Sequence, residues 1–92
     1  MIKNFKHRGL ERFFSNSNYK GIPAERADRI LRMLDLLDAC ATPTDMNLPG
    51  YKFHELKGDR KGTYAIAVSG NYRITFGFEG EDAIDVDLED YH

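Results

Sequence analysis

The sequence has no tryptophan, only one cysteine and no long hydrophobic run among its 92 residues. The lone Cys40 excludes an internal disulfide, and no metal-ligand spacing surrounds it, so we expect it to be a small buried hydrophobic residue on a helix. No apolar segment approaches the roughly 20 residues that a membrane helix needs. Met1–Phe5 is not followed by an apolar signal core. The expectation is a cytoplasmic protein without a membrane partner.

Sequence motifs for several kinds of chemistry are missing as well. There is no phosphate-binding glycine loop, no nucleophile elbow and no zinc-ligand spacing, so the sequence predicts neither a bound metal nor a cofactor. The length leaves room for one domain, which we expect to span residues 1–92. The 41% hydrophobic content, with six Phe and five Tyr, suffices for one modest core.

Positive charge is absent from the last part of the chain. Residues 79–92 hold seven acids and no Lys or Arg, whereas residues 1–78 hold thirteen bases and eight acids. The local charges of −7 and +5 give the net charge of −2. An acidic protein can therefore still present a basic patch to an anionic partner, although charge clusters are more often solvated faces.

Two segments in the first half of the chain have helical periodicity. Leu10, Phe13 and Phe14 predict a short helix over His7–Ser15. A longer helix is expected from Pro23 to about Ala41, since proline suits a first helical turn and apolar residues recur on one side. The arginines on its other side are more commonly solvated than bound to nucleic acid.

The hydrophobic period changes to two in the second half. Tyr51–Glu55 is expected to form a strand, with a further short strand at Met1–Phe5. Three alternating segments follow, and Gly70-Asn71 predicts a two-residue hairpin turn between the first two. We predict an α+β domain with two N-terminal helices packed on one face of a small, mainly antiparallel sheet. The residues expected on the apolar face are Tyr64, Ile66, Val68, Tyr72, Ile74, Phe76, Phe78, Ile84, Val86 and Leu88.

The residues best suited to chemistry lie at 52–60 and 90–92. By alternation, His54 and Arg73 share the polar face of the sheet, where Thr75 and Gly77 leave a shallow, sparsely filled surface. Alternation would bury Asp90 with the apolar residues of the last strand, so that strand must end or bend near residue 89 if Asp90 is to join His54. Two interpretations of Arg73 are equally consistent with the sequence: an ion pair with Asp85 or Asp87 on a neighbouring strand, or contact with a phosphate.

Two histidines beside cations fit cleavage of an RNA phosphodiester. The reaction needs a base for the ribose 2′-OH, an acid for the leaving 5′-oxygen and positive charge at the phosphorane. Histidine, with an unperturbed pKa of about 6.5, can fill either proton role at neutral pH. His54 and His92 are the candidates, and which is the base and which the acid stays open. Lys57 and Arg73 would supply positive charge, while Asp90 could orient a histidine and Tyr91 could stack on a base.

At these residues the sequence resembles a known family, and the resemblance covers essentially the whole chain. The matching segments are Ile2–Leu10, Lys52–Arg60, Asn71–Phe76 and Asp87–His92. Together they resemble the HigB toxins of bacterial toxin–antitoxin modules, within the RelE superfamily. The segment after Lys52 and the terminal Asp-Tyr-His are specific when both occur at these spacings.

The resemblance implies a RelE-like microbial RNase fold and a ribosome-dependent endoribonuclease that cuts messenger RNA in the ribosomal A site without a metal. It implies a helix-turn-helix antitoxin partner, similar to HigA, and contact with operator DNA only through that antitoxin. It also implies the site residues: His54, Asp90 and His92 for proton transfer and orientation, Tyr91 for holding the nucleotide, Lys57 and Arg73 for charge on the scissile phosphate, and Lys52, Arg60 and Lys61 for contact with RNA or ribosome.

The sequence departs from the family pattern at two positions, where Tyr64 and Tyr72 stand in place of the usual tryptophan. Both changes keep an aromatic residue and leave the catalytic set intact. Two other functions remain as alternatives. One is a ParE-like toxin that inhibits DNA gyrase by binding, and the other is a non-catalytic inhibitor that binds the ribosome. Neither needs two histidines and an acid, so the full set favours the nuclease.

Overall fold

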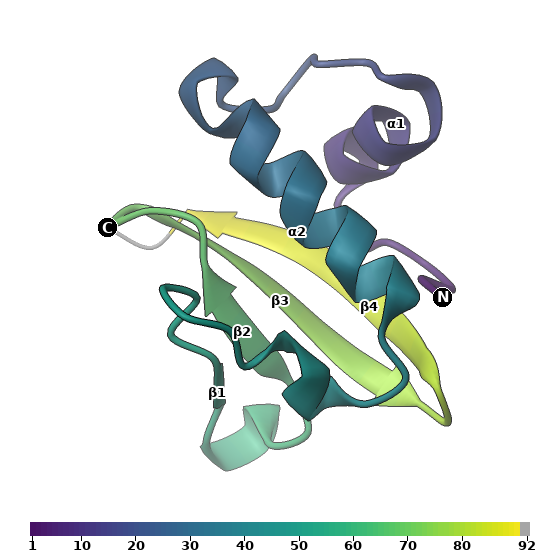
Figure 1. The fold of residues 1–92 in the computed structure, drawn as a ribbon, viewed down its shortest axis with the longest axis vertical. Coiled ribbons are helices and arrows are strands. Elements are labelled where there is room, and N and C mark those ends of the chain that lie inside the picture. Colours follow the sequence, from purple (N-terminus) through teal and green to yellow (C-terminus); the bar gives the residue numbers. More distant parts are fainter. Residues whose placement is uncertain (91–92) are drawn as a thin grey trace.

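The helices come first along the chain and the sheet follows. The structure is a computed structural model and describes residues 1–90. Figure 1 shows α2 lying across one face of the sheet. In chain order, the helices and strands are α1 (Arg8–Asn16), α2 (Ala27–Ala39), β1 (His54–Glu55), β2 (Tyr64–Ala67), β3 (Tyr72–Glu79) and β4 (Asp82–Asp90), with short 3-10 turns η1 (Ala24–Arg26), η2 (Pro43–Met46) and η3 (Gly58–Arg60).

Both predicted helices are present. His7 caps α1, because its Nδ1 accepts a hydrogen bond from the backbone N–H of Leu10 at 3.0 Å. The second helix begins with the 3-10 turn η1 after Pro23 and becomes α-helical at Ala27. Cys40 is its C-cap and is half-buried rather than buried, with its thiol donating to Leu36 O. No helix within residues 1–90 is long and apolar enough to cross a bilayer.

The four strands form one antiparallel sheet in the order β1-β2-β3-β4. Two sequence predictions differ from it in length. The strand expected at Tyr51–Glu55 is reduced to His54–Glu55. The two-residue hairpin between β2 and β3 is a four-residue turn over residues 68–71, because Ser69 Oγ accepts from the backbone N–H groups of Asn71 and Tyr72. The first residues make only isolated parallel bridges to β4, at Ile2 and Phe5.

A β-bulge divides β4 into two halves. Gly77 pairs with Ile84, but Thr75 pairs with Asp87, so one extra residue of β4 lies between these pairs. Asp85 takes the left-handed conformation there, with φ of +52°. The prediction that Ile84 and Val86 share a face is therefore wrong: Val86 is buried in the core, whereas Ile84 lies on Gly77's side of the sheet.

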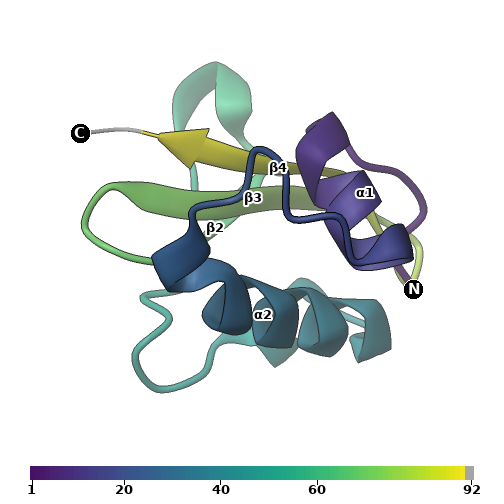
Figure 2. The ribbon, with the colours of Figure 1, turned by 90° about the horizontal axis from the view of Figure 1, so that it is seen from above.

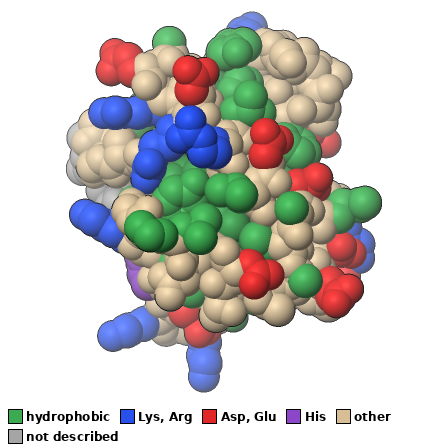
Figure 3. All heavy atoms as spheres, viewed as in Figure 1, with side chains coloured by type: hydrophobic (Ala, Val, Ile, Leu, Met, Phe, Trp, Pro, Cys, Tyr) green, Lys and Arg blue, Asp and Glu red, His purple; other side chains and the backbone are tan. Residues whose placement is uncertain are grey.

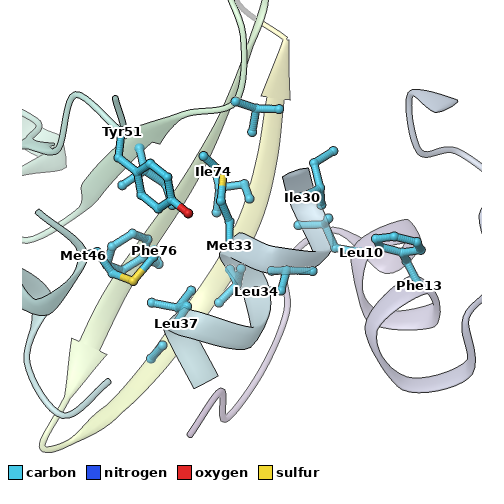
Figure 4. Packing of buried hydrophobic residues seen from close by; sticks show 14 of the residues in the cluster. Leu10, Phe13, Ile30, Met33, Leu34, Leu37, Met46, Tyr51, Ile74 and Phe76 are labelled. Carbon is cyan, nitrogen blue, oxygen red and sulfur yellow. The ribbon is translucent and has the colours of Figure 1, made fainter. Parts of the chain in front are cut away.

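The hydrophobic core lies between α2 and the sheet. Figure 4 shows Met33, Leu34 and Leu37 of α2 next to Ile74 and Phe76 of β3, with Leu10 and Phe13 of α1 on the other side of α2. All seven side chains are at most 2% exposed. The predicted core positions Tyr64, Tyr72, Phe78 and Leu88 pack against this cluster while remaining partly exposed.

The sheet has a second face, turned away from α2, which we call the open face. Figure 2 shows η3 on the side of the sheet opposite to α2. The register places His54, Ala65, Thr75 and Asp87 in one row across this face, because directly paired residues point to the same side. Arg73 and Glu89 lie in the next row. The predicted sharing of the polar face by His54 and Arg73 is confirmed.

Candidate active site

Glu89 is the centre of a cluster of polar side chains on the open face. Its carboxylate accepts a hydrogen bond from Arg73 Nε at 3.0 Å, and Arg73 Nη2 lies 2.9 Å from the same oxygen. Arg60 Nη2 and Nη1 lie 2.5 Å and 3.3 Å from the two carboxylate oxygens. Thr75 Oγ1 donates to Oε2 at 3.1 Å. One carboxylate thus holds two guanidinium groups together, and the three charges leave a net +1.

These contacts change the acidity of the cluster. The hydrogen bond from Arg60 is the largest cause that lowers the pKa of Glu89 to about 2, with further hydrogen bonds from Arg73 and Thr75, while partial burial opposes the shift. The same hydrogen bond raises the pKa of Arg60. Glu89 therefore stays ionised throughout the physiological range, and both arginines keep their partner.

The cluster also covers the middle of the open face. Arg60 reaches from the loop between β1 and β2 to Glu89 on β4, so this pair crosses over β2 and β3. Ala65 is 0% exposed and Thr75 only 2% exposed, although both point away from the helices. The polar face is therefore less open than the sequence predicted next to Arg73.

His54 lies on the outer strand β1 and is exposed. Its Nδ1 is 2.9 Å from the backbone oxygen of Lys52. A carbonyl oxygen only accepts hydrogen bonds, so Nδ1 carries the proton and Nε2 has the free lone pair in the neutral ring. Lys52 itself has a left-handed backbone, with φ of +51°, which aims its carbonyl at the ring. The backbone before β1 thus selects the tautomer of His54.

The remaining predicted cations surround the η3 turn. Lys57 precedes this turn and Lys61 follows it, and both are exposed. With Gly58 and Glu55 they line a shallow hollow of about 320 Å³ at the edge of the sheet. Lys52 lies elsewhere, in a hollow of about 400 Å³ beside Gly70 and the end of β2. The structure therefore brings Lys57, Arg60 and Lys61 together and sets Lys52 apart.

Asp90 ends β4 opposite Tyr72 and is exposed. The bend in β4 lies at the bulge rather than near Glu89, and the strand continues regularly through Asp90. His54 and Asp90 belong to the two outer strands of the four-stranded sheet, separated by three interstrand spacings of about 4.8 Å each, or about 14 Å. Tyr91 and His92, the other predicted terminal residues, lie outside the described residues.

Another hollow on the open face lies beyond the Glu89 cluster. It has a volume of about 360 Å³. The small residues Thr75 and Gly77 line it, as the sequence predicted for a sparsely filled face. Ile84, turned to this side by the bulge, lines it too, and Arg60 joins it to the Glu89 cluster.

The predicted pairing of Asp85 and Asp87 with cations is wrong, since neither forms an ion pair within the described residues. Asp85 Oδ1 accepts from Asn4 Nδ2 at 2.9 Å, and Asn4 Oδ1 accepts from the Asp85 backbone N–H at 3.2 Å. Asp87 Oδ1 accepts from the backbone N–H of Leu88. Without the extra residue of the bulge the hairpin register would set Leu88 opposite Arg73, whereas the bulge places Glu89 there. Sequence reasoning missed Glu89 for this reason.

The opposite side of the molecule carries cations of a different kind. Figure 3 shows Lys and Arg side chains gathered beside a hydrophobic area on the α2 side. Arg29 of α2 donates to the backbone oxygens of Gly50 and Ala67 at 3.1 Å and 3.0 Å, and its guanidinium lies 5.2 Å from the centroid of the Tyr51 ring. This arginine ties α2 to the sheet, so part of the predicted arginine stripe is structural rather than solvated.

No group of three or more His, Cys, Asp or Glu residues within residues 1–90 is placed to hold a metal ion. Among the described residues, the open face carries the exposed His54, the pair Arg60 and Arg73 held by Glu89, and two lysines near η3. Such a set combines an acid–base group with positive charge, as the cleavage of a phosphodiester requires.

Comparison with known proteins identifies the class. Residues 3–92 match the family described as the RelE-like toxin of type II toxin-antitoxin system HigB. The chain is 45% identical over 92 residues to the endoribonuclease HigB of Proteus vulgaris, covering 100% of both proteins. It is 33% identical over 78 residues to toxin HigB-1 of Vibrio cholerae serotype O1, which is 83% of this chain and 82% of that protein.

The chain is therefore a RelE-like toxin of a type II toxin–antitoxin system. Within that class it belongs to the HigB-like family, and the resemblance found in the sequence is confirmed. Membership of such a system implies a cognate antitoxin.

Proposed function

We propose that the chain is a ribosome-dependent endoribonuclease that cuts messenger RNA in the ribosomal A site and so inhibits translation. The observation that carries the proposal is the Glu89-held pair Arg60 and Arg73 on the same face of the sheet as His54. The full-length similarity to a protein named as an endoribonuclease supports it.

The first chemical step removes the proton from the ribose 2′-OH. His54 Nε2 takes this proton, because its Nδ1–H is held by the carbonyl of Lys52. The 2′-oxygen then bonds to the adjacent phosphorus. The deprotonating histidine lies on an outer strand and is exposed, so an RNA strand held by the ribosome can approach it without a rearrangement of the core.

The second requirement is charge on the phosphorane. Arg73 and Lys57 stabilise its oxygens, and the net positive charge of the Glu89 cluster persists because the carboxylate balances only one of two guanidinium groups. As the bond between phosphorus and the 5′-oxygen breaks, the leaving oxygen takes a proton from an acid. The C-terminal residues Asp90 and His92 supply and orient this acid, and Tyr91 holds the neighbouring nucleotide.

In this proposal the base and the acid lie on different sides of the RNA. His54 on β1 and Asp90 on β4 are too far apart for direct contact, at about 14 Å between strand axes. Asp90 pairs with Tyr72, next to the Arg73–Glu89 pair, so its side chain points to the helix side of the sheet and can reach the RNA only around the end of β4. The ribosome supplies the positioning that the modest basic surface lacks, with Lys52, Arg60 and Lys61 as contacts to RNA or ribosome.

The cognate antitoxin is proposed to be a helix-turn-helix protein similar to HigA, through which alone the toxin would reach operator DNA. This follows from the family and adds no residue of the toxin to the active site.

Primer extension on a defined messenger RNA, with and without programmed ribosomes, tests the proposal. Discrete cuts that need ribosomes and disappear in His54→Ala and in His92→Gln are expected. His7→Asn is the matched control, because it removes a histidine from α1 while keeping a side chain that can cap the helix. Growth inhibition without any cut would contradict the proposal and would favour a toxin that acts by binding, with DNA gyrase as the next target.

A further inference from the structure

The 360 Å³ hollow on the open face has walls of two kinds. The apolar part of its lining, here called the floor, includes Gly77 and the half-buried side chain of Ile84. Its rim carries three cations, Lys6, Arg60 and Lys61. Ile84 is an apolar side chain on an otherwise polar face of the sheet, so covering its exposed part with a ligand would be favourable.

The β-bulge creates this floor. Without the extra residue at Asp85, alternation would turn Ile84 into the core together with Val86. The reciprocal hydrogen bonds between Asp85 and Asn4 hold the bulge to the N-terminal segment. Backbone bonds from Lys6 and His7 to Val86 O continue that attachment and bring Lys6 to the rim. The same local irregularity thus supplies both the floor and one rim cation.

Gly77 keeps the hollow open. A Cβ built at this position would lie 3.4 Å from Ile84 Cγ1 and 3.6 Å from the backbone oxygen of Gly62. Any larger side chain would therefore occupy the space between Ile84 and the loop after η3. Gly77 does not have a positive φ, so its backbone does not require glycine and the open space is the consequence that matters.

We infer that this hollow is a subsite for the base of a nucleotide next to the one that is cut. A planar base lies against Ile84 and Gly77, as bases bind between apolar side chains in other nucleic-acid enzymes. The phosphates of that nucleotide contact the cations of the rim, and Arg60 links the subsite to the Glu89 cluster. Asp59 and Asp85 also line the hollow and can only accept hydrogen bonds, so they face the N–H groups of the base rather than its phosphates.

This inference rests on the proposed function for its biological meaning, but its test does not require cleavage. Amide chemical shifts of the toxin are followed by NMR during titration with each of the four nucleoside 5′-monophosphates, and with ribose 5-phosphate as the probe without a base. Shifts at Gly62, Gly77 and Ile84 that are larger with at least one nucleotide than with ribose 5-phosphate are expected. Equal shifts with ribose 5-phosphate, or no shifts at these residues, would overturn the inference.

Two variants localise the binding. Gly77→Val fills the hollow and should weaken nucleotide binding about 10-fold or more, since a stacked base contributes a factor of about 5 to 150. Gly70→Val is the matched control, because Gly70 has open space around it and lies in the turn between β2 and β3. If Gly77→Val does not fold, Ile84→Ser removes the floor from a half-buried position and should weaken binding similarly. Unchanged affinity in a folded variant would overturn the subsite.

A cleavage assay separates this inference from the proposed function. In a toxin that cuts RNA, Gly77→Val should raise KM and change which codons are cut, while kcat at the best codon changes less, because the base next to the cut contributes binding rather than chemistry. If the wild type binds nucleotides in the hollow but cuts no RNA, the subsite inference is supported and the proposed nuclease activity is contradicted. If it cuts RNA with a codon preference that Gly77→Val and Ile84→Ser leave unchanged, the proposed nuclease activity is supported and the subsite inference is contradicted.

Discussion

Arg73 and Glu89 are direct register partners on β3 and β4, and their side chains meet at 2.9 Å and 3.0 Å through two nitrogens of one guanidinium. Arg73 is therefore fixed by the sheet as well as by its side chain. The Glu89 side chain is 19% exposed, so the pair is partly shielded from water, and the cost of desolvating both charges offsets part of their attraction. This geometry makes Glu89 a positioning residue for Arg73.

The first prediction concerns acid stability. The pKa of Glu89 is lowered from 4.5 to about 2, so the folded protein keeps this carboxylate charged where the unfolded chain takes up a proton. The resulting stabilisation is complete above about pH 5 and is lost as the pH falls toward 2. The shift corresponds to at most about 3 kcal/mol, and solvent screening lowers the expected value to about 1–2 kcal/mol. Urea unfolding at pH 7, 5, 4 and 3 measures it.

Glu89→Gln should remove this part of the pH dependence. It should also lower the melting temperature at pH 7 by about 4–8 °C for each kcal/mol lost. Asp87→Asn is the control, since Asp87 is another half-buried acid on the open face and accepts a hydrogen bond from the backbone N–H of Leu88 rather than from an arginine in the described part of the chain. A Glu89→Gln protein whose unfolding free energy follows pH as the wild type does would show that the arginine contacts do not stabilise the fold.

The second prediction concerns the shape of the cation at position 73. Lysine keeps the charge but has no planar fork, so it cannot meet one carboxylate through two nitrogens. Arg73→Lys should lower ribosome-dependent cleavage by about 10²-fold, mainly in kcat, with a smaller change in stability. Arg32→Lys is the matched control, because it makes the same exchange at an exposed position of α2, away from the open face. Wild-type cleavage by Arg73→Lys would mean that charge alone suffices there.

The sequence predicted the layers of the fold but missed the register of its last hairpin. The helices and the alternating strands have strong periodicities, which local side-chain burial determines. The hairpin of β3 and β4 shows that periodicity does not determine the pairing register of two strands. Glu79 pairs with Asp82 around a two-residue turn, and continuing that register would set the apolar Ile74 against a polar residue of β4. Only an extra residue restores apolar pairing with Leu88, so the mismatch itself was a signal of the bulge.

The candidate site was predictable to the same degree. His54, Lys57, Arg60 and Arg73 could be selected by residue type and face, because each lies in or beside a strand with clear alternation. The contacts of the arginines with Glu89 could not be predicted, because they depend on the register shift that the β-bulge introduces earlier in β4. The contact between the Lys52 carbonyl and His54 could not be predicted either, since a positive φ at a lysine has no signature in the sequence.

The third prediction tests the backbone at Lys52. A φ of +51° costs a side chain with a Cβ about 1 kcal/mol and a β-branched side chain more, whereas glycine adopts it freely. Lys52→Gly should therefore keep stability and the orientation of His54, and Lys52→Val should destabilise the protein by about 1–2 kcal/mol relative to Lys52→Gly. Thermal unfolding of the two variants measures the difference, which does not include the lysine charge because both variants lack it. Equal stabilities would mean that residue 52 does not hold the left-handed conformation.

The fourth prediction tests the bulge at Asp85. This residue combines a φ of +52° with hydrogen bonds to Asn4, and asparagine can serve both needs because it tolerates the left-handed region and keeps a carbonyl oxygen for Asn4 Nδ2. Asp85→Asn should therefore change the unfolding free energy by less than about 0.5 kcal/mol. Asp85→Val should lower it by about 2 kcal/mol, since it adds backbone strain and leaves Asn4 without this partner. Because the bulge turns Ile84 to the open face, Asp85→Val should also disturb nucleotide-induced shifts at Ile84 more than those at His54. A stable Asp85→Val protein with wild-type shifts would show that the register of β4 is set by the core residues alone.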